Sequence, residues 1–311
     1  MMNALPLISI ILPVYNGESF VANAIESVMY QTYPGWELLI VDDGSTDGTA
    51  GICDASASSD DRIRVFHQSN GGVNTARAKG IDNSSGDYFV FLDADDTLPE
   101  DSLQRALDCM SDDVSILAEG YGDMDLDNER YALELISGRI GPALWGKMIA
   151  SYVVKSVDYH LNPALRMGED LLLNLMMSLH ADHIKLTQER IYLVDHSNER
   201  SVTRTFKKTW EYEKFYFHQM ENLFVEKCRD FSNYEDIVYY MNKSRLNGIK
   251  YVMLDGNNVG YRDKEFLALE SFCKSSGRPF GASERLVFRL KNRSLYSFVI
   301  RLSTLLRKTF R

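Results

Sequence analysis

The feature that most constrains this chain is a regular alternation of short apolar segments with helix-forming segments over its first 120 residues. The apolar segments have the length and β-branched content of buried strands, and turn residues end them. Strands that alternate with helices at this spacing predict a mostly parallel sheet covered by helices on both faces. The predicted strands span residues 7–14, 36–41, 63–67, 88–92 and 114–120.

Polar clusters follow three of these predicted strands. "PVYNG" begins at residue 13, "VDDGSTD" at residue 41 and "LDADD" at residue 92. Ligands of mostly parallel sheets bind beyond the carboxyl ends of the strands. We therefore expect the three clusters to converge in one cleft.

The third cluster crowds Asp93, Asp95 and Asp96 at the end of a buried strand. Neighbouring carboxylates repel one another, and each resists removal from water. Such an arrangement does not serve stability, and it indicates a site that receives positive charge. The alternative is a solvated acidic loop end.

Composition excludes several classes of protein. The chain has 311 residues, 45% hydrophobic and 25% charged, as expected for a soluble globular protein. The net charge of −10 argues against a nucleic-acid partner. Four widely separated cysteines predict reduced thiols in a cytoplasmic protein. The N-terminal stretch lacks the pattern of a signal peptide, and no apolar run is long enough to span a membrane.

The pattern changes beyond about Thr205, where aromatic-rich helical segments replace the strands. We predict an α/β domain over residues 1–205 and a helical C-terminal region over residues 206–311. Residues 284–311 carry eight lysines and arginines and one acid, with apolar side chains at helical spacing. This basic tail predicts peripheral contact with an anionic surface on the inner face of the cell membrane. The alternative is a helix that docks on the acidic body of the same protein.

Four motifs in order, "PVYNG", "VDDGSTDGT", "FLDADD" and "MGED", resemble those of the inverting family 2 glycosyltransferases of bacterial surface-polysaccharide synthesis. Any one of them is weak alone, but the four share the family's order and spacing from Leu7 to about Arg204. The resemblance implies a GT-A-type fold over residues 1–205. It also implies a hexosyltransferase that moves a sugar from a nucleotide diphosphate donor, expected to be a UDP-sugar, to a hydroxyl of a growing, lipid-linked glycan.

The resemblance assigns the acidic cluster to metal and ribose binding. It implies that Asp95 ligates Mg²⁺ or Mn²⁺ and that Asp93 contacts the ribose. A divalent cation would offset the charge that grows on the diphosphate as the glycosidic bond breaks. His196 lies where related enzymes supply a further metal or diphosphate ligand. Asp96 either assists them or caps the helix expected to begin near Pro99.

The resemblance assigns the other motifs to the nucleotide, including its uracil ring. Asp43 is expected to accept from the N3–H of uracil, while Asp42 holds the loop. Arg77 is expected to bring a positive charge toward the nucleotide. The segment expected to pack on the nucleotide comprises Pro13, Val14, Tyr15 and Asn16.

Asp170, in "RMGEDLLLNLMM", is implied to be the general base that takes the proton of the acceptor hydroxyl. Trp145 and Lys147 precede it as they do in the family. The alternative is that Glu169 and Asp170 only stabilise a helix N-terminus, an effect worth about 0.3–1 kcal/mol.

Two alternative functions remain open. "DADDT" and "GDMDLD" also fit motifs of haloacid-dehalogenase-like phosphatases. In those enzymes the first motif ends the first strand, and several strands separate the two motifs. Here three strand–loop units come before the first motif. The other alternative is a non-catalytic nucleotide-sugar-binding module, against which the complete acidic motif and Asp170 both argue.

Overall fold

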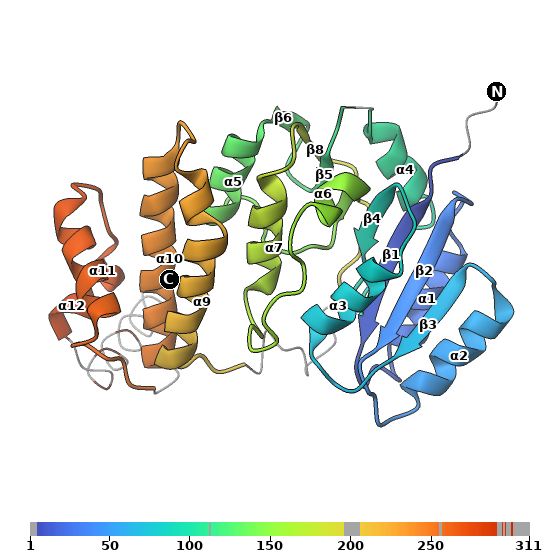
Figure 1. Ribbon diagram of the computed structural model, residues 1–311, viewed down its shortest axis with the longest axis horizontal. Helices are drawn as coiled ribbons and strands as arrows, with labels where there is room; N and C mark the ends of the chain where they lie inside the picture. Colours follow the sequence, from blue (N-terminus) through green and yellow to red (C-terminus); the bar gives the residue numbers. More distant parts are fainter. Residues whose placement is uncertain are drawn as a thin grey trace, which may run out of the picture. The chain divides into compact units, whose positions relative to one another are not determined.

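The computed structural model describes residues 5–111, 113–195, 206–254 and 257–290, together with residues 294, 296 and 300. The chain divides into two compact units, Met1–Ser201 and Val202–Arg311. Each unit has a hydrophobic core of its own. Figure 1 labels the elements of both.

The first unit is built on an eight-stranded sheet with the strand order β3-β2-β1-β4-β7-β5-β8-β6. In the described sheet β7 runs antiparallel to β4 and β5, and β6 runs antiparallel to β8, whereas the other neighbouring pairs are parallel. The prediction of a mostly parallel sheet is therefore confirmed. The strands are β1 (Ile8–Val14), β2 (Trp36–Asp42), β3 (Ile63–His67), β4 (Tyr88–Phe91), β5 (Ile116–Glu119), β6 (Met124–Leu126), β7 (Lys147–Ala150) and β8 (Ile184–Thr187).

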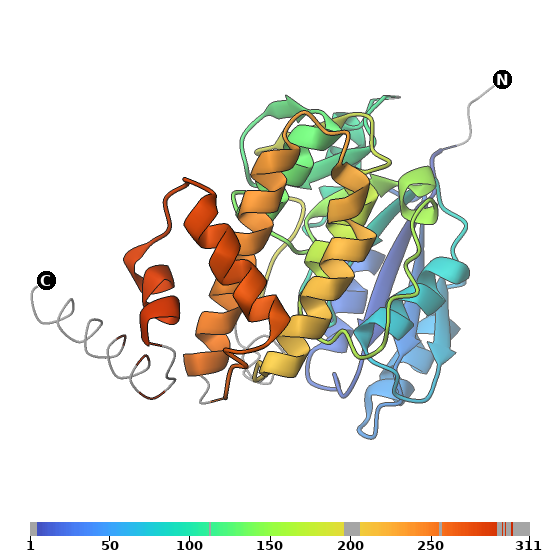
Figure 2. The same ribbon diagram turned by 60° about the vertical axis from the view of Figure 1, so that its left-hand side comes forward.

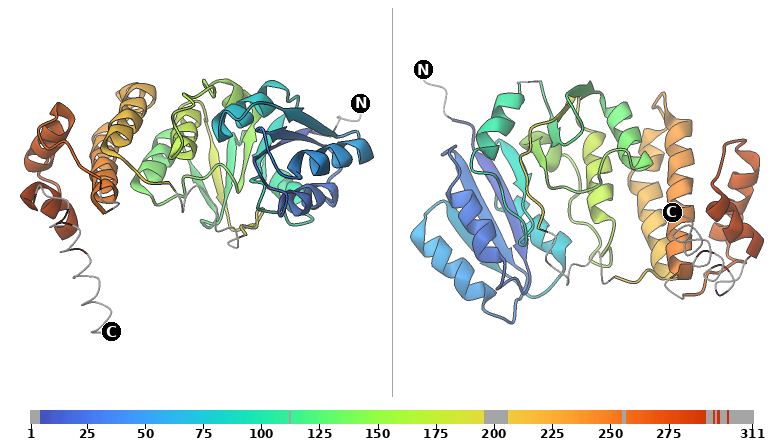
Figure 3. Two further views of the ribbon diagram at one scale, coloured as in Figure 1. Left: turned by 90° about the horizontal axis from the view of Figure 1, so that it is seen from below. Right: turned by 180° about the vertical axis from the view of Figure 1, so that it is seen from behind.

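Helices cover both faces of the parallel half of this sheet. α1 (Val21–Met29) and α2 (Thr49–Ser59) lie on one face, and α3 (Val73–Asp82) lies on the other (Figures 1 and 3). This follows from right-handed crossovers, because the chain moves outward from β1 to β3 and then returns past β1 to β4. Every residue of β1 and β2 is buried, as the apolar sequences of these two central strands require.

Four further helices lie among the described residues of the first unit: α4 (Ser102–Cys109), α5 (Asn128–Ser137), α6 (Ser151–Lys155) and α7 (Glu169–Ser178). α4 begins at Ser102 and not near Pro99, so the predicted start is wrong. The Pro99 carbonyl accepts hydrogen bonds from Ser102 N at 3.0 Å and from Gln31 Nε2 at 2.6 Å. These bonds hold residues 99–101 in a turn that leads into the helix.

The described part of the second unit is helical. It consists of α9 (Trp210–Leu223), the 3₁₀ helix η1 (Val225–Cys228), α10 (Tyr234–Leu254), α11 (Lys264–Ser275) and α12 (Ala282–Leu290). α9 and α10 pack side by side, as the two long helices in orange shades in Figure 2 show. Aromatic side chains fill much of the core, among them Trp210, Phe266 and Phe280.

The beginning of the basic tail packs within this second unit. Val287 of α12 and Tyr296 are completely buried in its core, and Leu286, Phe288 and Leu290 pack against that core. The apolar side chains of α12 are thus used inside the unit. Residues 301–311 lie outside the described residues, and the membrane contact predicted for residues 284–311 remains a prediction. No described helix is both long and apolar enough to cross a bilayer.

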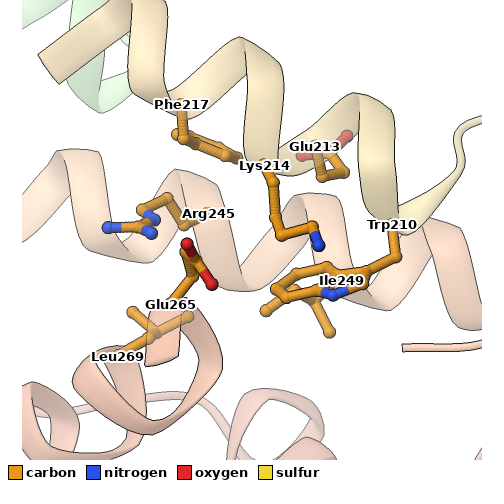
Figure 4. Close-up of a pocket in the computed structure, with 8 residues that line it drawn as sticks. All are labelled: Trp210, Glu213, Lys214, Phe217, Arg245, Ile249, Glu265 and Leu269. Atoms are coloured by element: carbon orange, nitrogen blue, oxygen red, sulfur yellow. The ribbon is translucent and has the colours of Figure 1, made fainter. Parts of the chain in front are cut away.

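A small cavity lies among α9, α10 and α11 (Figure 4). Its volume is about 10 Å³, room for roughly one water molecule. The Glu213 side chain on its wall is fully buried, and Glu213 Oε1 lies 2.9 Å from Lys208 Nζ. No residue predicted to bind the nucleotide or to act as the general base lines this cavity, so the cavity is separate from the candidate site.

Candidate active site

The three polar clusters follow β1, β2 and β4, which are adjacent and parallel. Asp43 N donates to Val14 O at 2.8 Å, and Leu92 N donates to Ile11 O at 3.0 Å. The sheet therefore brings the clusters to the same edge, as their positions after predicted strands indicated.

The loops after β1 and β2 are joined by side-chain hydrogen bonds. Asn16 has a left-handed backbone with φ of 50°, and its N–H donates to Ser45 Oγ at 2.9 Å. Its side-chain oxygen accepts from Thr46 N at 2.8 Å. Pro13 and Val14 are buried, whereas Tyr15 is 52% exposed. Within the segment predicted to pack on the nucleotide, the Tyr15 side chain is therefore open to a ligand. Asn16 instead joins the loop after β1 to the loop after β2.

Asp43 is a buried carboxylate held by the loop that enters α3. It accepts hydrogen bonds of 2.8 Å from Gln68 Nε2, Gly71 N and Gly72 N. A carboxylate offers about four lone-pair sites, so one more donor, such as an imide N–H, can still be accepted. The neighbouring Asp42 accepts from Ser45 N at 3.0 Å and bonds the His67 ring at 2.9 Å, which suits the loop-holding role predicted for it.

Arg77 is a buried cation at the centre of a cluster of carboxylates. Its Nη1 lies 2.6 Å from Asp170 Oδ1 and 3.8 Å from Glu169 Oε1. Its Nη2 lies 3.3 Å from Asp93 Oδ1. One guanidinium thus joins the acidic motif after β4 to the predicted base on α7. The sequence indicated a cation facing the nucleotide, and it did not indicate these partners.

Close packing of α3 on the sheet sets the position of Arg77. A Cβ atom on Gly80 would lie 2.7 Å from Ile11 Cγ2 of β1, so the helix backbone approaches the strand closely. Asn74, one turn before Arg77, donates from Nδ2 to Leu165 O at 2.7 Å and so holds the segment that leads to α7. Gly168 then begins α7 with φ of 87°. One face of α3 therefore fixes the start of α7.

Burial and like charges perturb the carboxyl groups of the cluster. Desolvation raises the pKa of Asp93 to about 6, although Arg77 acts in the opposite direction. Burial, and after it the charge of Asp170, raises the pKa of Glu169. Glu169 Oε2 is buried without a hydrogen-bond partner among the described residues. Asp170 is the member that accepts the short hydrogen bond from Arg77.

The segment "LWGKM", residues 144–148, lies near α7 through contacts that do not involve α3. Lys147 is buried on β7, where desolvation lowers its pKa to about 8, and its Nζ donates to Ala143 O. Asn174 of α7 donates from Nδ2 to the same oxygen at 3.0 Å. The Trp145 ring stacks on Tyr192, with ring centroids 5.1 Å apart. These contacts give the segment a supporting role beside Asp170.

Asp95 borders an open pocket of about 310 Å³ that Asp195 also lines. Among the described residues no three histidine, cysteine or acidic side chains gather closely enough to hold a metal ion. Mg²⁺ is usually bound through one or two carboxylates together with substrate phosphates, which matches an open carboxylate at this edge. The residues therefore fit a metal shared with a nucleotide diphosphate. The other predicted ligand, His196, lies outside the described residues.

Asp96 does not cap α4, so the capping alternative is wrong. Its buried carboxylate accepts from the Tyr192 hydroxyl at 2.8 Å and from Asp195 N at 2.7 Å. The N-cap position of α4 belongs to Asp101. Asp96 instead ties the acidic motif to residues 192–195.

Comparisons with known proteins identify the family. The model of the family named Glycosyl transferase family 2 matches residues 9–148. The Bacillus subtilis (strain 168) protein named Putative teichuronic acid biosynthesis glycosyltransferase TuaG is 30% identical over 250 residues, which cover 74% of this chain and 98% of that protein. The chain belongs to glycosyltransferase family 2.

Solved structures place this glycosyltransferase in the GT-A fold. S. aureus TarS 1–349 in complex with UDP-GlcNAc has a TM-score of 0.63 at 17% identity, covering 96% of this chain and 92% of that one. The mannosyltransferase PcManGT from Pyrobaculum calidifontis, in complex with GDP-Man and Mn²⁺, has a TM-score of 0.53 at 15% identity, covering 96% and 87%. At these identities the likeness shows the fold alone.

Membership of this family excludes the phosphatase alternative and the non-catalytic one. In the glycosyltransferase Asp93 follows β4, the fourth strand of the chain, as the sequence indicated. The second phosphatase-like motif ends at Asp127, whose side chain accepts from Arg130 N at 2.8 Å and caps α5. Both motifs therefore have other roles here.

Two supporting residues of the glycosyltransferase have no signal in its sequence. Asn74 differs from the small residues usual at its position, which marks it as unusual without indicating that it holds Leu165. Tyr192 lies in a short apolar stretch that resembles an ordinary strand. Their contacts span 91 and 96–99 positions of sequence, so only the fold reveals them.

Proposed function

We propose that this family 2 glycosyltransferase is metal-dependent and transfers one sugar, with inversion, from a UDP-sugar to a hydroxyl of a growing, lipid-linked surface glycan. The observation that carries the proposal is the bridge made by Arg77. Its guanidinium holds Asp170 at 2.6 Å and Asp93 at 3.3 Å, which sets a carboxylate suited to proton removal beside the acidic motif.

The proposed donor site lies at the carboxyl ends of β1, β2 and β4. Tyr15 would pack on the uracil ring, and Asp43 would accept its N3–H. Asp93 would contact the ribose. UDP-GlcNAc bound to TarS and GDP-Man bound to PcManGT support a nucleotide-sugar donor for this fold, and Asp43 makes us favour uracil.

Asp95, with His196 as the proposed second protein ligand, would hold Mg²⁺ or Mn²⁺. The ion would offset the negative charge of the departing diphosphate. Mn²⁺ is present in the PcManGT complex, which supports this assignment by analogy of fold.

Asp170 would act as the general base. The acceptor hydroxyl gives its proton to the Asp170 carboxylate while its oxygen forms the new bond to the anomeric carbon. The bond from that carbon to the nucleoside diphosphate breaks in the same displacement, so the configuration inverts. Arg77 fixes one carboxylate oxygen of Asp170 and thereby orients the group.

The proposed setting is cell-surface polysaccharide synthesis. The name of the relative TuaG refers to teichuronic acid biosynthesis, which supports a glycan acceptor. A lipid-linked acceptor would be presented at a membrane, where the proposed contact of the basic tail would place a peripheral enzyme.

The test is nucleotide binding measured with and without metal. We expect UDP to raise the melting temperature in the presence of Mn²⁺ or Mg²⁺ and to have little effect after chelation, because the ligand stabilises only the folded state that binds it. Asp95→Ala should fold and lose this metal dependence. Equal stabilisation of wild type and variant by UDP with Mn²⁺ would overturn the ligand assignment. A screen of nucleotide sugars for transfer and for product configuration then tests the donor and the inversion.

A further inference from the structure

We infer that the hydroxyl group of Tyr192 is a positioning group for the acidic motif and holds Asp95 in place for metal and diphosphate. The inference rests on the proposed function, since it takes Asp95 as the ligand. The Tyr192 hydroxyl accepts a hydrogen bond from Asp93 N at 3.0 Å and donates one to Asp96 Oδ2 at 2.8 Å. The side chain is 1% exposed, so water does not compete for these bonds.

The two bonds reach both ends of one turn. Asp96 N donates to Asp93 O at 3.1 Å, which closes a four-residue turn from Asp93 to Asp96. Asp95 lies inside this turn. A single hydroxyl therefore holds Asp93, two residues before the position proposed to bind metal, and Asp96, the residue after it.

The tyrosine itself is held firmly. Its ring stacks on Trp145, at 16° between the ring planes. Leu193 exchanges backbone hydrogen bonds with Thr97 at 2.9 and 3.1 Å, and Asp195 N donates to Asp96 Oδ1 at 2.7 Å. Since these contacts surround the hydroxyl, loss of the hydroxyl alone would loosen the turn while the surrounding segment stays paired.

The experiment compares two variants that each remove one buried tyrosine hydroxyl. Tyr192→Phe keeps the stacked ring and leaves Asp93 N and Asp96 Oδ2 without their partner. Tyr131→Phe is the matched control, because Tyr131 is completely buried in the same unit and its hydroxyl has no hydrogen-bond partner among the described residues. Calorimetry measures the Kd of UDP at saturating Mn²⁺ and the Mn²⁺ concentration for half-saturation. Thermal melting without ligands reports the fold.

We expect Tyr192→Phe to bind UDP with Mn²⁺ about tenfold more weakly, because a lost buried hydrogen bond has an effect of this order and the variant loses both bonds of the hydroxyl. It should also need more Mn²⁺ for half-saturation. Tyr131→Phe should match wild type in both. Equal affinity of Tyr192→Phe and wild type would overturn the inference, and so would equal losses in the two variants.

A second variant keeps the inference testable if Tyr192→Phe does not fold. Asp96→Asn retains an oxygen that can accept from Asp195 N but replaces the acceptor of the Tyr192 hydroxyl. It should weaken Mn²⁺-dependent UDP binding while the native tyrosine is kept. Where Tyr192→Phe does fold, the double variant should lose less than the sum of the two single effects, since both remove the same hydrogen bond. Unchanged binding in Asp96→Asn, or full additivity, would count against the inference. A wild-type chain that does not bind UDP with Mn²⁺ would overturn the proposed function instead.

Discussion

Arg77 is the residue on which the charge balance of the site depends. It is 5% exposed and faces Asp93, Glu169 and Asp170. Removing one partner of such a cluster is costly, because an uncompensated buried charge remains. The planar guanidinium presents Nη1 to Asp170 and Nη2 to Asp93 in a fixed fork, whereas a lysine would offer a single nitrogen. Variants that test the chemistry should therefore leave Arg77 intact.

Asp170→Asn separates binding from chemistry. The amide retains an oxygen that can accept from Arg77, so the cluster keeps its shape, but it cannot take a proton at neutral pH. We expect donor affinity close to wild type and a transfer rate lower by about 10²–10⁴-fold. Initial rates with a competent acceptor, beside calorimetry with the donor, measure both. If Glu169→Gln lowered the transfer rate more than Asp170→Asn, the assignment of Asp170 as the general base would be wrong.

Glu169→Gln should change stability in a pH-dependent way. The folded state raises the pKa of Glu169 from 4.5 to about 7 by burial and by the charge of Asp170. A carboxyl group with a raised pKa favours the folded state below its unfolded pKa, and this contribution is lost as pH rises through the folded pKa. The variant, which cannot ionise, should therefore gain stability relative to wild type between pH 5 and pH 8, by on the order of 1 kcal/mol. Urea unfolding at pH 5 and pH 8 measures the difference in the free energy of unfolding between the variant and wild type. If this difference did not change with pH, the raised pKa of Glu169 would be contradicted.

The sequence predicted most of the residues that meet at this site but not how they pair. Asp93 and Asp170 are recognisable because they sit in motifs, and Arg77 because it follows a glycine-rich loop. Their contact depends on the fold, which brings the start of α7 to the face of α3 that carries Asn74 and Arg77. Of the two alternatives for Asp96, the capping one was wrong, because helix capping is a local pattern whereas its bond to Tyr192 spans 96 positions.

At the scale of elements, four of the five strands predicted from apolar runs form the parallel half of the sheet, and the fifth is β5 in the other half. β1 and β2 are buried along their whole length, so periodicity and burial agree. β6, β7 and β8 have only three or four residues each, and each contains a charged residue, so no continuous apolar run marks them. The half of the sheet that supports the proposed donor site was therefore predictable, whereas in the other half only β5 was.

Gly80→Ala tests the close approach of α3 to the sheet. The added methyl group would lie 2.7 Å from Ile11 Cγ2, so the helix must shift. We expect a loss of about 1–3 kcal/mol in the free energy of unfolding, as for overpacking in a core. Gly51→Ala is the matched control, because Gly51 lies in α2 with no other atom within 4 Å of the added group.

The control should gain about 0.5–1 kcal/mol, the usual difference between alanine and glycine within a helix. Chemical denaturation of both variants gives the two values. A Gly80→Ala protein as stable as wild type would show that α3 can move without cost. The position of Arg77 would then be less firmly fixed than the packing implies.

At the scale of the whole molecule, charge is unevenly distributed along the chain. The net charge is −10, although residues 284–311 contain eight lysines and arginines and one acid. Part of that segment already packs inside the second unit through Val287 and Tyr296. Four of the eight cations lie beyond residue 300, so removal of residues 301–311 takes away half of the positive side chains of this segment.

Removal of residues 301–311 should leave a folded protein that still binds UDP with Mn²⁺. It should sediment less with vesicles that contain anionic lipid, and added salt should weaken the sedimentation of the full chain, because screening reduces the attraction. The control keeps the length and neutralises charge by Arg301→Gln, Arg307→Gln, Lys308→Gln and Arg311→Gln. Equal sedimentation of the truncated, neutralised and intact chains would contradict the membrane prediction.

The bridge made by Arg77 also has a consequence for the order in which the enzyme is completed during synthesis. Arg77 and Asp93 lie 16 positions apart, but Asp170 follows Arg77 by 93 positions. A growing chain that has left the ribosome only as far as α4 therefore offers Arg77 a single carboxylate of this cluster. The proposed nucleotide half is present before the proposed base, and the emergence of α7 both balances the buried cation and supplies the group that would make the protein a catalyst.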